Sequence, residues 1–76
     1  MVRITLIHAL VHSVAPINEA LASDWPEAQR MNLLDDSLAR DVAAQGGRLD
    51  EAMTARFITL ADYAVTTGAD GILFTC

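Results

Sequence analysis

The sequence GADGILFTC, residues 68–76, places a short apolar run between turn-forming residues and the single cysteine of the chain. Residues 71–74 are bounded by glycine and aspartate on one side and by a polar threonine on the other, which predicts a short buried strand. The polar Thr75 and Cys76 follow at once. A strand that changes from apolar to polar in this way is expected to end at the rim of a sheet.

Two further strands are predicted upstream. Residues 2–7, VRITLI, are rich in β-branched side chains, and residues 31–34, MNLL, form a shorter apolar run. Between them, Ile17, Ala20 and Leu21 lie on one face of a helix that is expected to end at SDWP, residues 23–26, because the residue before a proline leaves the helical region.

Two helical segments separate the second strand from the third. Leu38 and Val42 belong to a short helix that Gly46 and Gly47 close. A longer helix follows, with acidic residues near its start and Gly68 at its end. Its core-facing stripe is predicted to contain Leu49, Met53, Phe57, Leu60, Ala61 and Ala64.

Strands that alternate with amphipathic helices pair in parallel through right-handed crossovers. The sequence therefore predicts a three-layer α/β fold over residues 1–76. Its parallel sheet is expected to have strand order 2-1-3, with the first strand in the centre and helices on both faces. Antiparallel pairing of the first and third strands would contradict this prediction.

Composition argues against several classes of protein. The chain has 76 residues, a net charge of −5, 53% hydrophobic residues and one cysteine. Its five basic residues are scattered, which argues against nucleic-acid binding, and no apolar run is long enough to span a membrane. No metal-ligand spacing and no targeting segment are found, so a cytoplasmic protein without a metal is expected.

The high apolar fraction has a further implication, since no disulfide or metal is expected to support so small a core. We expect a partner that covers the apolar surface left exposed by this small core, either more chain or another subunit. Alone, the chain is expected to be poorly folded or to associate.

Polar residues follow all three predicted strands. His8 follows the first, Asp35 and Asp36 the second, and Thr75 and Cys76 the third. The carboxyl ends of parallel strands meet at one edge, where open α/β sheets bind ligands. Ser13 joins this edge at the start of the first helix, whose free N–H groups attract anions.

Each of these residues also has a structural interpretation. Cys76 can be a packed core residue, and His8 a hydrogen-bonded structural one. Asp35, Asp36 and Ser13 are suited to capping helices, and His12 to a loop. No glycine-rich phosphate loop is present, because QGGR and TGADG lack the dinucleotide spacing.

Three segments together resemble the N-terminal part of the Asp/Glu/hydantoin racemase superfamily, and they cover nearly the whole chain. They are LIHALVHSVAPINEAL at the front, NLLDDSL in the middle and RFITLADYAVTTGADGILFTC at the end. The most specific element is the apolar strand after GADG that delivers Thr75 and Cys76.

The resemblance implies a cofactor-independent amino-acid or hydantoin racemase with two α/β lobes and one catalytic cysteine in each. Cys76 matches the first-lobe cysteine. Thr75 would lie beside the substrate's carboxylate, Ser13 matches a region that helps to hold it, and His8 is expected to share the substrate-binding edge. No cofactor or metal is implied, and the substrate is a small carboxylate or a hydantoin-like compound.

The sequence departs from this pattern because residues 1–76 contain neither the second lobe nor the second cysteine. They are therefore expected to be a fragment that is inactive alone and that needs the rest of a longer chain or forms a homo-oligomer. Two alternatives remain open. One is an enzyme of the related arylmalonate decarboxylase or maleate isomerase type, and the other is a non-catalytic α/β domain with a structural Cys76.

Overall fold

The computed structural model describes residues 1–75, which form one three-stranded sheet with its helices. All strands are parallel and their order is β2-β1-β3, so the predicted α/β fold and strand order are confirmed. The elements in chain order are β1 (Arg3–His8), the 3₁₀ turn η1 (Val11–Ser13), α1 (Val14–Asp24), β2 (Gln29–Leu34), α2 (Ser37–Ala44), α3 (Glu51–Thr66) and β3 (Gly71–Thr75).

The register of the sheet aligns the carboxyl ends of the three strands. His8, the last residue of β1, pairs with Leu34 on β2 and with Thr75 on β3. Side chains that lie side by side in parallel strands project to the same face. The residues that end the strands therefore meet at one edge, as the topology predicts.

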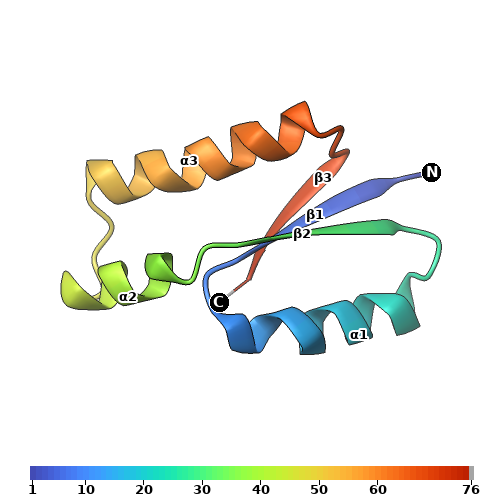
Figure 1. Ribbon diagram of the computed structural model, residues 1–76, viewed down its shortest axis with the longest axis horizontal. Helices are drawn as coiled ribbons and strands as arrows, with labels where there is room; N and C mark the ends of the chain where they lie inside the picture. Colours follow the sequence, from blue (N-terminus) through green and yellow to red (C-terminus); the bar gives the residue numbers. More distant parts are fainter. Residues whose placement is uncertain (76) are drawn as a thin grey trace.

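Helices lie on both faces of the sheet, with α1 on one side of the strands and α3 on the other (Figure 1). Because β2 and β3 flank β1 on opposite sides, two right-handed crossovers place their helices on opposite faces. Phe57 of α3 packs edge-to-face on Phe74 of β3, with ring centroids 5.6 Å apart. On the other face, α1 contacts β2 through Asn18 and Asn32.

The helix ends follow the local sequence signals. α1 stops at Asp24, one residue before the Trp25–Pro26 pair. The side chain of Asp50 caps α3 by accepting a hydrogen bond from the Met53 amide at 2.8 Å. Gly68 follows α3 with φ +88°, a left-handed conformation that favours glycine.

Several details of the sequence prediction are wrong. β1 ends at His8 rather than at Ile7, and β2 begins at Gln29, two residues before the predicted start. The hydrogen bond from the Gln29 amide to the Val2 carbonyl, at 2.8 Å, leads into the β2 ladder, although residues 29–30 carry no apolar signal. Leu49 was predicted to be core, but it precedes α3 and is 59% exposed.

The core is small and follows the centre of the sheet. Leu6 and Ile7 of β1 are fully buried, and Leu38 of α2 packs with Met53 of α3. α1 contributes no buried residue. Among the described residues, no helix has both the length and the apolar character needed to cross a membrane.

Candidate functional site at the carboxyl edge of the sheet

A buried histidine joins all three strands at the carboxyl edge. His8 is fully buried at the end of β1. Its Nδ1 lies 2.7 Å from Oγ1 of Thr75 on β3, and its Nε2 lies 2.8 Å from Oδ1 of Asn32 on β2. Two residues predicted from the sequence, His8 and Thr75, are therefore in direct contact.

The network continues from β2 to α1. Asn18 donates from Nδ2 to Oδ1 of Asn32 at 2.7 Å, and Asn32 donates back from Nδ2 to Oδ1 of Asn18 at 3.1 Å. The Nδ2 group of Asn18 also donates to the carbonyl of Val14, one turn earlier, at 2.7 Å. A continuous hydrogen-bonded chain thus runs from the first turn of α1 to the last residue of β3.

The backbone holds this edge in place. The Ala9 amide donates to the carbonyl of Thr75 at 3.3 Å, and the Asp35 amide donates to the carbonyl of His8 at 3.0 Å. Asn32 pairs with Leu6, two residues before His8, so its side chain reaches the imidazole diagonally on the same face. Thr75 is 8% exposed, so its hydroxyl lies just under the rim.

Ser13 lies at the same edge but stands apart from this network. It is buried, it directly precedes α1, and its amide donates to the Leu10 carbonyl at 3.1 Å. Its side chain makes no capping hydrogen bond, so the predicted capping role is wrong. Within residues 1–75, no hydrogen bond links its hydroxyl to His8 or Thr75. Cys76, the predicted catalytic residue, lies outside the described residues.

A charged cluster fixes the connection that follows β2. The Ser37 hydroxyl and the Ser37 amide, at 3.0 Å, both donate to Oδ1 of Asp35. Arg56 of α3 donates to the Ser37 hydroxyl at 2.6 Å and to Asp41 at 2.7 Å, and its Nη2 lies 3.6 Å from Asp35 Oδ2. The Ser37 hydroxyl, followed by the Ser37 amide and Arg56, lowers the pKa of Asp35, while partial burial opposes the shift. Asp35 thus orders the turn into α2, and Asp36 makes no side-chain cap.

A hollow of about 350 Å³ opens between the two connections that leave the carboxyl edge. Residues after β1 form one wall, and residues of the α2 region form the other. The charged or titratable groups on its walls are His12, Asp36 and Arg40, beside Leu10, Val11 and Ala39. This hollow combines a cation, a carboxylate and an imidazole next to the sheet edge, which suits a small polar ligand.

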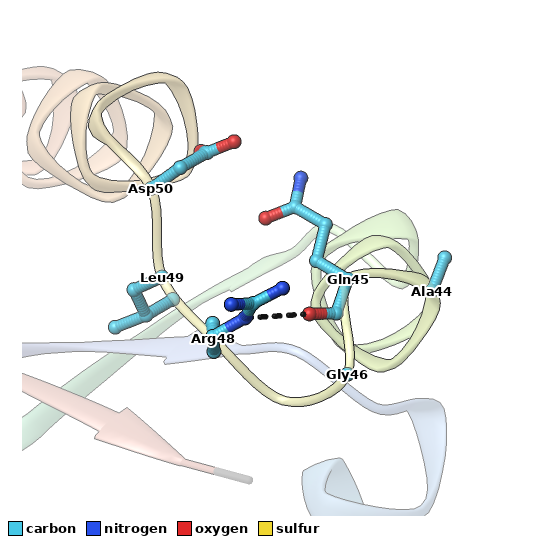
Figure 2. A pocket seen from close by; sticks show the side chains of 6 residues that line it. All are labelled: Ala44, Gln45, Gly46, Arg48, Leu49 and Asp50. Carbon is cyan, nitrogen blue, oxygen red and sulfur yellow. Dashed lines mark hydrogen bonds between the residues drawn. The ribbon is translucent and has the colours of Figure 1, made fainter.

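A second hollow, of about 550 Å³, lies at the connection between α2 and α3 (Figure 2). Residues 44–46 and 48–50, from a single stretch of the chain, form its lining. Arg48 folds back to donate from Nε to the Gln45 carbonyl at 3.4 Å, and Asp50 is engaged in capping α3. No polar groups from separate elements converge there, so it is a weaker candidate. Among residues 1–75, no group of three His, Cys, Asp or Glu side chains is arranged to hold a metal ion.

Two members of the network were missed from the sequence. Asn32 and Asn18 lie inside segments that carry the family resemblance, but no role was assigned to either, and each alone is typical of a surface amide. Only the position of Asn32 in its strand could have indicated its role. Asn32 is the one amide inside the apolar run MNLL, on a strand beside the strand that ends in His8. A polar residue at such a point calls for a partner across the sheet.

A scan against protein-family models and searches of curated proteins and of solved structures found no match for this chain. Its function is therefore inferred from the residues that meet at the carboxyl edge.

Proposed function

We propose that this chain forms the first lobe of a cofactor-independent, racemase-like enzyme that transfers a proton at a carbon alpha to a carboxyl or carbonyl group. The observation that carries the proposal is the contact between His8 and Thr75 at the carboxyl edge. It fixes the residue that precedes the single cysteine at the place where open α/β sheets bind ligands.

The proposed chemistry uses the Cys76 thiolate as the base. The thiolate removes the α-proton on one face of the substrate, so a C–H bond breaks, an S–H bond forms, and the electron pair moves onto the neighbouring carboxyl or carbonyl group. A thiol in a second lobe then protonates the opposite face. A free thiol titrates near 8.5, so N–H donors or cations that lower its pKa would assist this step.

Two groups at the edge are suited to hold the substrate's carboxylate. Arg40 lines the hollow beside the edge and presents a guanidinium, which matches carboxylate geometry. Ser13 leads into α1, whose first-turn N–H groups favour anions. We propose a small carboxylate or hydantoin-like substrate, with no metal or organic cofactor.

The proposed assembly follows from the exposed apolar surface. Leu73 and Phe74 on the edge strand β3 are each more than 40% exposed, so a neighbouring strand or subunit would complete the fold. We propose that the rest of a longer chain or a second copy covers them, and that the protein works in the cytoplasm. Alone, the 76-residue fragment is proposed to be inactive, because it has one thiol.

The decisive experiment measures exchange of the substrate's α-hydrogen with deuterated solvent. It uses the full-length protein and a panel of amino acids, hydantoins and arylmalonates. Cys76→Ser keeps the size of the side chain but removes an accessible thiolate, so exchange should fall by about 10²- to 10⁴-fold. Ser23→Ala, on the exposed side of α1, is the matched control and should keep the parent rate. Equal exchange rates in the parent and the Cys76→Ser variant would refute the catalytic role of Cys76.

A second candidate function is a non-catalytic α/β domain. The observation that favours it is the complete burial of His8, whose two ring nitrogens are satisfied by Thr75 and Asn32. In this case the network only holds the strands together. Absence of exchange with every substrate in the panel, from a folded full-length protein, would favour this second candidate.

A further inference from the structure

We infer that Asn18 and Asn32 are positioning residues that fix which ring nitrogen of His8 carries the proton, and that Thr75 therefore presents an acceptor, not a donor, to a ligand. This inference deepens the proposed function and rests on it for the identity of the substrate. The hydrogen-bond order itself follows from the geometry of the network.

The direction of each hydrogen bond in the network follows from one group that can only accept. The Val14 carbonyl accepts a hydrogen bond from Asn18, so the amide nitrogen of Asn18 must face it. That orientation leaves Oδ1 of Asn18 to accept from Asn32, and Oδ1 of Asn32 then faces His8. Each step removes one of two possible amide orientations.

The orientation of Asn32 in turn decides which nitrogen of the His8 ring donates and which accepts. Because Asn32 presents an oxygen at 2.8 Å, Nε2 of His8 must be the protonated nitrogen. In a neutral ring Nδ1 then has only a lone pair, and the Thr75 hydroxyl donates to it at 2.7 Å. Within residues 1–75, no carboxylate contacts the ring, and both of its partners are neutral.

This arrangement determines what the Thr75 hydroxyl can offer to a ligand. Its single hydroxyl proton is used inside the network, so only oxygen lone pairs remain for a ligand. A lone pair accepts from an N–H group and repels a carboxylate oxygen. The site is therefore suited to substrates that carry an N–H beside the reacting carbon, namely amino acids and hydantoins, in preference to arylmalonates. The resemblance placed Thr75 beside the carboxylate; in this arrangement the carboxylate is held by another group.

The first test is nuclear magnetic resonance of the full-length protein with ¹⁵N-labelled histidine rings near pH 8. The variants His8→Gln and His12→Gln identify the signals of these two rings, and the exposed His12 serves as the internal reference. We expect the Nε2–H form of His8 in about tenfold excess, as one hydrogen bond of ordinary net strength would produce. Asn32→Leu should reduce this excess toward the ratio seen for His12.

Two results would overturn the inference: a dominant Nδ1–H form in the parent, or an unchanged ratio in Asn32→Leu. Backbone amide spectra of each variant establish that it remains folded, and Asn18→Leu offers a second perturbation farther from the ring. The second test compares α-hydrogen exchange across the panel. Exchange confined to substrates with an N–H supports the inference, and equal exchange of arylmalonates contradicts it. A loss of all exchange contradicts the proposed function alone, because the tautomer measurement still decides the hydrogen-bond order.

Discussion

Two threonines on the sheet differ in how their hydroxyls are satisfied. Thr75 bonds to His8, as described, whereas the hydroxyl of Thr5 is buried without a hydrogen-bond partner among the described residues. A buried hydroxyl without a hydrogen-bond partner destabilises the folded protein, and a hydrogen-bonded one stabilises it. The same substitution is therefore expected to have opposite effects at the two positions.

Thr5→Val should stabilise the protein by about 1 kcal/mol, because it replaces an unsatisfied hydroxyl by a methyl group of the same shape. Thr75→Val should destabilise it by about 1–3 kcal/mol, because it leaves Nδ1 of the buried His8 without a partner. Urea unfolding of both variants in parallel measures the two differences. A change of the same sign at both positions would show that β-propensity, and not hydrogen bonding, dominates.

At this scale the sequence predicted part of the site. His8 and Thr75 could be placed at one edge, because each follows an apolar strand and parallel strands end together. Their contact and its extension to Asn32 and Asn18 could not be predicted, because they depend on strand register and on the rotation of α1. Ser13 was placed at the correct edge, but its side chain does not cap α1.

Among the elements, α2 and α3 are held together by the charged cluster of Asp35, Ser37, Asp41 and Arg56. This cluster ties the turn that follows β2 to α3. It could not be predicted from the sequence, since Arg56 is 21 residues from Asp35 and lies on a separate helix. By contrast, the ends of α1 and α3 were predictable, because proline, aspartate and glycine act locally.

The cluster predicts a dependence of stability on pH. The pKa of Asp35 is lower in the folded state, so its contribution is complete above the unfolded-state value of about 3.9 and is lost as the pH falls through the folded-state value. Asp35→Asn should lose stability at pH 7 and show a shallower further loss between about pH 5 and pH 3. The effect is modest because the pair is about one-third exposed.

Unfolding midpoints in urea across this pH range provide the measurement. Asp36→Asn is the matched control, because the neighbouring aspartate makes no side-chain cap on α2. Identical pH profiles for Asp35→Asn and the parent would rule out Asp35 as a source of acid sensitivity.

The molecule as a whole is thin and exposes much apolar surface. Its radius of gyration is 13.0 Å, against about 11 Å for a folded domain of this length, and its shortest dimension is 13 Å. A mostly apolar hollow of about 460 Å³ lies open near Leu38 and Phe57. Composition alone predicted that apolar surface would remain exposed. The positions of the helices were needed to identify where on the molecule it lies.

The 76-residue chain is therefore expected to self-associate through the β3 edge, where Leu73 and Phe74 project to opposite faces. Leu73→Lys should shift the chain toward monomer in analytical ultracentrifugation under reducing conditions, because a charge on an edge strand opposes pairing. Val65→Lys, at an exposed position on α3, should leave association unchanged. A parent chain that sediments as a monomer and melts in one sharp transition would contradict this expectation.

The central position of β1 also has a consequence for synthesis on the ribosome. β1 can pair with β2 as soon as Leu34 has emerged, but its other neighbour, β3, is complete only at Thr75. At 5–20 residues per second, the roughly 40 intervening residues take about 2–8 s to translate. During that interval Nδ1 of His8 has no partner from β3. Within residues 1–75, the hydrogen bond from Thr75 to His8 is thus among the last contacts to form, and its appearance marks the pairing of β1 on both sides.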